Sequence, residues 1–259
     1  METLTVILTA VFGLVWGSFL NVVIYRLPRE MSLVRPPSTC PGCGTKIKPY
    51  DNIPLFSYLF LGGKCRNCGR RISPVYPLVE GLTALGFLLV YGQSGGALNL
   101  EFFAGCLFTS ALIALGFIDY FHQILPDAIT MPGLVLALVY SFFRDDLTFR
   151  GALIGAVSGG GFLLLVYGAY RLIRKREGLG MGDVTMLLMI GAYLGLARTL
   201  LTLILASFVG ALVGVLFILR RKKTLQFALP FGTFLAPAAF VAALWGERIV
   251  SAYFGLYRR

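Results

Sequence analysis

The sequence predicts an all-α, polytopic membrane protein that crosses the bilayer about eight times and has one large loop between its first two spans. Hydrophobic residues make up 57% of the chain and charged residues only 14%, and the mean hydropathy of +0.80 lies well above that of soluble proteins. Apolar runs near the roughly 20 residues needed to span a bilayer recur along the whole chain. Most basic residues lie in alternate loops between these runs, as in polytopic proteins.

Eight apolar runs are candidate transmembrane helices, centred near residues 14, 84, 110, 135, 162, 190, 209 and 240. The second and sixth runs, at about residues 76–91 and 184–195, are short for a full span, so we expect tilt, re-entrance or local thinning of the bilayer there. The first run, at residues 4–24, has neither a basic segment before it nor a small-residue cleavage site after it. It is therefore predicted to be a retained span and not a cleaved secretory signal.

The distribution of basic residues predicts the orientation of the spans. Of the 23 Lys and Arg residues, 17 lie in segments 26–77, 171–183 and 220–223, which share one side of the membrane if there are eight spans. The positive-inside rule makes that side cytoplasmic and places both termini outside. The net charge of +11 is a topology signal, aided by anionic lipid headgroups. We expect no nucleic-acid partner, because no basic patch is interleaved with exposed aromatic residues in a soluble domain.

The loop at residues 26–77 is the one long polar segment, and it contains two C-x2-C pairs. Cys40 and Cys43 are separated from Cys65 and Cys68 by 21 residues, slightly more than the usual spacing of zinc ribbons. Four thiolates leave no coordination position open, so the predicted zinc is structural. Two disulfides are the alternative, which the reducing cytoplasm disfavours.

Three of the 12 acidic residues stand directly at the ends of apolar runs. Asp119 follows one run, whereas Asp127 and Asp183 each precede one, and the predicted topology puts all three at the cytoplasmic membrane boundary. Asp127 and Asp183 have an alternative explanation as helix caps, since a carboxylate at a helix N-terminus accepts backbone N–H bonds. Asp119 ends a run, where the helix dipole disfavours an acid, so it points to function. Gly180 and Gly182, beside Asp183, permit close approach of another backbone.

The chemistry that best fits these acids is peptide hydrolysis by a pair of aspartates. Two neighbouring carboxyls share one proton, so the ionised group takes a proton from water while the other donates one to the scissile carbonyl. No G-x-S-x-G motif competes, and His122 is the only histidine. The alternatives are a multi-pass ion-coupled transporter that uses Asp119, Asp127 and Asp183 as a relay, and an assembly factor that docks through the zinc loop. Relay acids usually lie nearer the membrane midplane.

At these residues the chain resembles the bacterial type IV prepilin peptidases. The resemblance extends over nearly the whole chain: GSFLNVVIYRLP in the first span, DNIPLFSYL between the cysteine pairs, YPLVE, ID followed by LPD, the G-x-G-D segment, and a late PFGTFLAP. It implies a G-x-G-D aspartic peptidase of the bacterial inner membrane, with its active site on the cytoplasmic side. The implied catalytic pair is Asp119 and Asp183, and Asp127, Gly180 and Gly182 are the implied supporting residues.

The resemblance also implies substrates and cofactors. Members of this family cut the short basic leader from prepilins and pseudopilins at the cytoplasmic face, after a glycine, and many then methylate the new amino terminus with S-adenosylmethionine. It places methylation at the zinc loop near Asn21 and Glu80, two polar residues inside apolar stretches for which a mutual structural contact is the other explanation. The sequence points to no residues for binding the methyl donor, since no dinucleotide-type glycine loop follows a strand, and to no oligomeric state.

Three positions depart from the family pattern. Thr185 stands where lysine often follows G-x-G-D-V, Val75 where arginine often precedes YPLVE, and Thr233 where proline is common in FGTFLAP. None of the three is expected to touch the aspartate pair, and Val75 bears on methylation because it lies closest to the zinc loop. The expected division of the chain is a first transmembrane helix at 1–25, a cytoplasmic zinc-binding loop and methyltransferase region at 26–77, and a transmembrane aspartic peptidase core at 78–259.

Overall fold

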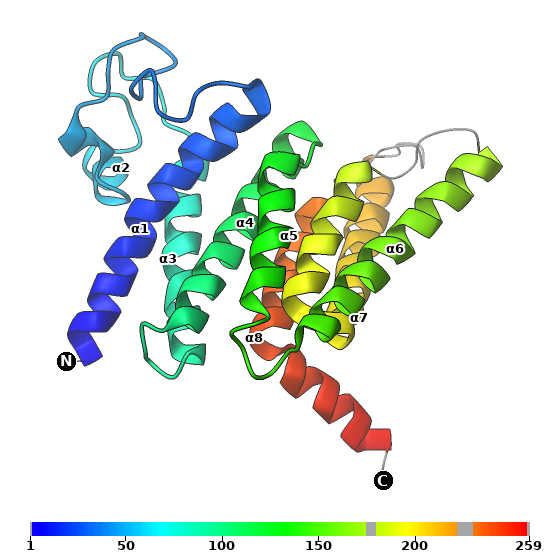
Figure 1. Ribbon diagram of the computed structural model, residues 1–259. Helices are drawn as coiled ribbons and strands as arrows, with labels where there is room; N and C mark the ends of the chain where they lie inside the picture. Colours follow the sequence, from blue (N-terminus) through cyan, green and yellow to red (C-terminus); the bar gives the residue numbers. More distant parts are fainter. Residues whose placement is uncertain (1, 175–179, 222–229, 258–259) are drawn as a thin grey trace. The chain divides into compact units, whose positions relative to one another are not determined.

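The computed structural model of the chain describes residues 2–174, 180–221 and 230–257, and in these ranges every regular element is helical (Figure 1). The long helices are α1 (Glu2–Arg26), α3 (Val75–Gln93), α4 (Leu100–His122), α5 (Asp127–Tyr140), α6 (Phe149–Arg174), α7 (Met181–Arg221) and α8 (Gly232–Tyr257). The loop between α1 and α3 holds the short α2 (Phe56–Phe60) and two 3-10 turns, η1 (Leu27–Arg29) and η2 (Pro49–Asn52). The predicted all-α class is confirmed.

Six helices in the described part of the chain are long and apolar enough to cross a membrane, namely α1, α3, α4, α6, α7 and α8. Helix α5 is apolar but has only 14 residues. Helix α7, with 41 residues, is interrupted at Gly195, whose φ of 74° and ψ of 174° are not helical, and Figure 1 shows its two halves as separate rods. These segments match the apolar runs near residues 135, 190 and 209, while the count of eight spans stays a prediction.

The chain divides into two compact units, and the division falls within α4. The first unit, Met1–Ala114, contains α1 packed along α3. Gly13 and Gly17 make this packing close, because a Cβ at Gly13 would lie 2.6 Å from the Cα of Ala84 and one at Gly17 would lie 2.7 Å from the Cα of Glu80. Small residues four apart on one helix face let two apolar helices approach at backbone distance. Helix α3 therefore packs with α1.

The second compact unit, Leu115–Arg259, is built around α7, which packs against α5, α6 and α8. Gly155 of α6 and Gly191 of α7 bring two backbones into contact, since a Cβ at either position would overlap the carbonyl of the other. Met186 and Ile190 in the first half of α7 have no exposed surface. The half of α7 that begins with the G-x-G-D motif is therefore the buried centre of this unit.

The loop between α5 and α6 holds the break in α7 in place. Arg144 donates a hydrogen bond of 2.8 Å to the carbonyl oxygen of Tyr193, and its guanidinium lies over the ring of that tyrosine, 5.5 Å from its centre. Asp146 accepts hydrogen bonds from Arg144 and, at 3.2 Å, from Arg198 beyond the break. Gly195 lies between the two anchored positions, and its positive φ is one that glycine adopts without a steric penalty.

Candidate active site

Asp119 and Asp183 lie together at one end of the second unit. Asp119 is in the last turn of α4 and Asp183 is in the first turn of α7. Both residues are buried, with 5% and 7% of their surfaces exposed, and the charge of Asp119 acts on Asp183. Two buried carboxyls that interact in this way titrate as a pair, because a second negative charge is opposed by the first.

The first turn of α8 supplies the hydrogen bonds to Asp119. The backbone N–H of Thr233 donates to Asp119 Oδ2 at 2.7 Å, and the Thr233 hydroxyl lies 3.2 Å from the same oxygen. The N–H of Gly232, one residue earlier, interacts with both carboxyl groups. These N–H groups are free to do so because the first N–H groups of a helix have no partner within it.

The contact with Thr233 corrects an expectation from the sequence. None of the three departures from the family pattern was expected to touch the aspartate pair, and that expectation is wrong for Thr233. The sequence contains no local sign that the start of α8 packs against the end of α4. Neither Gly232 nor Thr233 was singled out as a site residue, although the PFGTFLAP segment that contains them carried part of the family resemblance.

Asp183 has a different environment from its partner. Its backbone N–H donates to the carbonyl of Gly180 at 3.1 Å, which closes the turn that leads into α7. Its side-chain Oδ1 is buried and has no hydrogen-bond partner within the described ranges 2–174, 180–221 and 230–257. Buried polar atoms almost always have a partner, so an unpaired one at a cluster of this kind is the position where a reacting molecule would bind.

The two glycines predicted to support Asp183 differ in how tightly they are packed. A Cβ at Gly182 would lie 2.7 Å from the Cβ of Leu125, so no larger residue fits without movement of the α4–α5 connection. A Cβ at Gly180 would lie 3.4 Å from Asp183 Oδ2, which is an ordinary contact. Gly232 is also confined, with Leu125 and Asp119 Oδ2 each 3.0 Å from a Cβ built there. Residues 175–179 of the loop before α7, predicted to be flexible, lie outside the described residues.

Asp127 lies at the edge of this cluster rather than inside it. It is the exposed first residue of α5 and follows the N-cap residue of that helix, where no side-chain capping bond forms. The Thr130 hydroxyl lies 3.4 Å from Asp127 Oδ1 and 3.2 Å from the hydroxyl of Thr185, which in turn donates to the carbonyl of Gly182 at 3.0 Å. These contacts connect the start of α5 to the turn that carries Asp183.

The four cysteines of the first unit form a cluster that could hold a metal ion. All four Sγ atoms of Cys40, Cys43, Cys65 and Cys68 lie within 4.8 Å of one another, as free thiols. Zinc–sulfur bonds of about 2.3 Å in a tetrahedron separate neighbouring sulfurs by about 3.8 Å. The Sγ atoms of Cys40 and Cys68 are 3.8 Å apart, so the arrangement fits a tetrahedral zinc site.

Each cysteine pair is presented by the same kind of turn. The N–H of Gly44 donates to the carbonyl of Cys40, and the N–H of Gly69 donates to that of Cys65, both at 2.9 Å. The two glycines have φ values of 69° and 68°, in the left-handed region that glycine tolerates. Hydrogen bonds with the side chains of Thr45 and Asn67 lower the pKa of the Cys43 thiol to about 6, which favours the thiolate form that metals bind.

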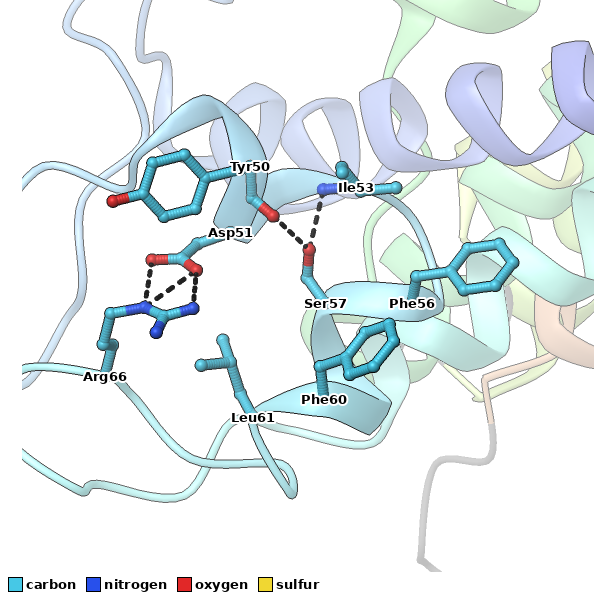
Figure 2. A pocket seen from close by; sticks show the side chains of 8 residues that line it. All are labelled: Tyr50, Asp51, Ile53, Phe56, Ser57, Phe60, Leu61 and Arg66. Atoms are coloured by element: carbon cyan, nitrogen blue, oxygen red, sulfur yellow. Dashed lines mark hydrogen bonds and ion pairs between the residues drawn. The ribbon is translucent and has the colours of Figure 1, made fainter.

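A hollow of about 580 Å³ lies in the same loop, between the two cysteine pairs in the sequence. Its lining residues are Tyr50, Asp51, Ile53, Phe56, Ser57, Phe60, Leu61 and Arg66. Figure 2 shows the rings of Phe56 and Phe60 on one side and the Asp51–Arg66 ion pair on the other. Arg66 donates to Asp51 at 2.7 Å and 3.0 Å, which holds the pKa of Asp51 below its usual range.

The polar residues Asn21 and Glu80 have structural partners: a backbone group for Asn21, and a backbone group and the side chain of Ser18 for Glu80. Asn21 donates to the carbonyl of Tyr76 at 3.0 Å, and Glu80 accepts from the N–H of Leu55 at 2.8 Å. The first bond joins α1 to α3, and the second ties the loop before α2 to α3. Both residues are buried, so these bonds satisfy groups that would otherwise destabilise apolar helices.

The fold and the site define a class of protein: a polytopic helical protein with a buried carboxyl pair and a four-cysteine loop. Comparison with known proteins identifies its family. The bacterial peptidase A24 N-terminal domain matches residues 11–94, and the type IV leader peptidase family matches residues 106–215. The chain belongs to the type IV leader peptidase family, which confirms the resemblance seen in the sequence.

Two curated relatives from Pseudomonas are similar over almost their whole length. The prepilin leader peptidase/N-methyltransferase of Pseudomonas aeruginosa is 39% identical, over 96% of this chain and 93% of the relative. The protein of the same name from Pseudomonas putida is 40% identical, over 95% of this chain and 92% of the relative. No solved structure matches the chain.

Proposed function

We propose that this protein is an aspartic endopeptidase of the bacterial inner membrane that removes the basic leader from type IV prepilins and pseudopilins. Family membership and the names of the relatives support this reaction. The observation that carries it is the pair of buried carboxyls, Asp119 and Asp183, one of which has an oxygen without a hydrogen-bond partner in the described chain. Asp127, Gly180 and Gly182 are supporting residues in this proposal.

The proposed hydrolysis needs no covalent intermediate. One carboxylate takes a proton from water as the water oxygen attacks the scissile carbonyl carbon, and the other carboxyl gives its proton to the carbonyl oxygen. When the C–N bond breaks, the first aspartate returns its proton to the leaving nitrogen, and a hydroxyl of the intermediate restores the proton of the second. The pair is then back in its starting state.

The position of the pair fits a substrate that already resides in the membrane. Asp119 ends a helix and Asp183 begins one, so both lie at the end of the bundle. The apolar segment of a prepilin would lie beside the spans while its basic leader stays at the surface, on the side of the basic loops, which we propose is the cytoplasm. A transporter relay would place its acids nearer the middle of the helices, so the position of this pair disfavours that alternative.

The test is a processing assay with the purified full-length protein and a prepilin in liposomes, read by mass spectrometry. We expect Asp119→Asn and Asp183→Asn each to abolish the loss of the leader mass, because neither asparagine can exchange the required proton. Asp145→Asn, an exposed acid between α5 and α6, is the matched control and should cleave normally. Normal cleavage by either pair variant would refute the proposed site.

We further propose that the chain methylates the new amino terminus with S-adenosylmethionine and that a structural zinc orders the first loop. The names of the relatives support the methylation, and the cysteine geometry supports zinc. The hollow is the proposed site of the donor, since Phe56 and Phe60 offer flat apolar surfaces for a purine and Asp51 and Arg66 offer charges for its amino-acid end. When bound, the donor supplies the methyl group.

Donor binding can be measured apart from activity. With zinc-loaded protein in detergent and radiolabelled S-adenosylmethionine, we expect Phe60→Ala to weaken equilibrium binding about tenfold, because an aromatic contact is lost. Leu59→Ala removes an exposed apolar side chain of the same helix outside the hollow and should bind as the wild type does. Equal binding by both variants would place the donor elsewhere, and absence of binding by the wild type would refute the methylation.

A further inference from the structure

We propose that Thr233 is a positioning residue that makes Asp119 the charged member of the aspartate pair and leaves the shared proton on Asp183. This inference rests on the proposed peptidase function and deepens it, because it assigns one role to each carboxyl. The inference is based on the difference between the environments of the two carboxyls. The start of α8 surrounds Asp119, and the turn before α7 surrounds Asp183.

Asp119 is surrounded by donors. The Thr233 N–H, at 2.7 Å from Asp119 Oδ2, can only donate, so that oxygen must accept. The Thr233 hydroxyl lies 3.2 Å from the same oxygen and 3.3 Å from the carbonyl oxygen of Gly116, so its single hydrogen is shared between two acceptors. The Gly232 N–H also acts on this carboxyl. A carboxylate accepts such bonds with its full negative charge, and bonds to a charged group are stronger than bonds to a neutral one. The arrangement therefore favours the ionised form of Asp119.

Asp183 has fewer donors than Asp119: the N–H groups of Gly180 and Gly232 act on its carboxyl, and no hydroxyl does so among the described residues. Its Oδ1 is buried without a partner among the residues that the structure describes. Of the two forms of a carboxyl, the ionised one suffers more from burial without hydrogen bonds. The negative charge of Asp119 also opposes a second negative charge on Asp183. A proton on Asp183 removes both penalties at once.

This asymmetry assigns the steps of the hydrolysis. Asp119 accepts the proton of the attacking water, and Asp183 donates its proton to the carbonyl oxygen of the scissile bond. During collapse of the intermediate, Asp119 gives its proton to the leaving nitrogen and Asp183 takes one from a hydroxyl, so protons balance over the cycle. The unpaired Oδ1 of Asp183 is then the atom that forms the hydrogen bond with the substrate carbonyl oxygen.

Thr233 allows each donor to be removed separately. Its N–H belongs to the first turn of α8 and has no partner within the helix, so Thr233→Pro removes this donor at a position where proline is tolerated. Thr233→Val keeps the N–H and the shape of the side chain but removes the hydroxyl. Thr233→Ser keeps both donors. Thr202→Val, in which a buried hydroxyl bonded to the carbonyl of Arg198 is lost, is the matched control away from the site.

The experiment measures kcat/KM for prepilin cleavage against pH with the full-length variants in liposomes. We expect Thr233→Val to lose roughly 10- to 100-fold, as for one hydrogen bond to a charged group. Thr233→Pro introduces the residue that is common here in the family, so it should still cleave, with a kcat/KM below that of the wild type. The acid limb of the profile should move towards neutral pH in both, because the carboxylate of Asp119 has lost donors. Thr233→Ser and Thr202→Val should keep the wild-type limb.

Two outcomes overturn the inference. If Thr233→Val and Thr233→Pro had the kcat/KM and the pH profile of the wild type, Thr233 would not be a positioning residue for Asp119. Lower activity with an unshifted acid limb would make Thr233 a packing residue without influence on the charge of Asp119. Both differ from failure of the proposed function, in which Asp119→Asn and Asp183→Asn themselves cleave normally. Thermal unfolding of each variant separates loss of folding from loss of catalysis.

Discussion

At the scale of single residues, the surroundings of the carboxyl pair depend on glycines as much as on the acids. Gly182 and Gly232 both pack against Leu125, which fills the space beside the pair from the connection between α4 and α5. A side chain at either glycine would push this leucine or the neighbouring carboxyl away. The close approach at Gly182 agrees with the reason given for glycine beside Asp183, whereas Gly180 has room for a methyl group.

This difference predicts unequal effects of two similar substitutions. Gly182→Ala should lower kcat/KM for cleavage about tenfold or more, because overpacking of about 1–3 kcal/mol must be relieved by moving Leu125 or the turn that carries Asp183. Gly180→Ala should stay within about threefold of the wild type, because its new methyl group makes an ordinary contact. The assay is prepilin processing with both variants side by side. Equal loss in both would mean that backbone freedom, and not space, sets the requirement for glycine.

At the scale of elements, α7 depends on contacts at both ends of its first half. One end begins at the G-x-G-D motif, and the other is the break at Gly195, which Arg144 and Asp146 hold through Tyr193 and Arg198 (residues 193–198). The half between these ends is buried.

The ion pairs of Asp146 with Arg144 and Arg198 predict a pH-dependent contribution to the stability of the fold. The hydrogen bond from Arg144 holds the pKa of Asp146 below its usual range, so the stabilisation is present above the unfolded value of about 3.9 and is lost as the pH falls through the lower folded value. Asp146→Asn should lower the midpoint of thermal unfolding by about 1–3 °C at pH 7, a small effect because the Asp146 side chain is partly exposed.

The measurement is thermal unfolding in detergent from pH 7 down to about pH 2, well below the ordinary pKa of aspartate. The gap between Asp146→Asn and the wild type should close on acidification. Asp145→Asn, the adjacent exposed acid, serves as the control and should show no gap at pH 7. A gap that persisted at low pH would mean that Asp146 acts through packing and not through its charge.

At the scale of the whole molecule, the chain has two compact units that hold different chemistry. The four cysteines and the hollow belong to the first, and the aspartate pair belongs to the second. The two family matches follow the same division, with residues 11–94 inside the first unit and most of residues 106–215 in the second. In the structure α3 packs against α1, and the expected three-part division, which groups α3 with the peptidase core, stays a prediction.

This division predicts that metal removal affects the two proposed activities unequally. Stripping zinc with a chelator, or Cys40→Ser, should reduce methylation and donor binding more than leader cleavage. Arg66 at the hollow directly follows the proposed zinc ligand Cys65, while both aspartates lie in the other unit. Zinc content, methyl incorporation and leader loss should be measured on the same samples. Equal loss of both activities would show that cleavage also requires the first loop.

Much of this arrangement could be predicted from the sequence because it is encoded locally. Apolar runs of span length form helices wherever they occur, and two C-x2-C pairs with glycine after each pair form metal-binding turns from neighbouring residues alone. The positions of Asp119 and Asp183 at the ends of apolar runs could also be predicted, since a run and its end are adjacent in the chain. These features required no knowledge of which helices pack together.

Only the tertiary structure decided which groups surround those acids. Thr233 reaches Asp119 across 114 positions in the chain, and Leu125 reaches both Gly182 and Gly232, because the last turn of α4 lies beside the first turns of α7 and α8. The sequence by itself determined the helical class, the cysteine cluster and the candidate acids, all of which follow from short-range patterns. The asymmetry of the acid pair arises from contacts between distant residues, and no local pattern contains them because packing of the helices creates them.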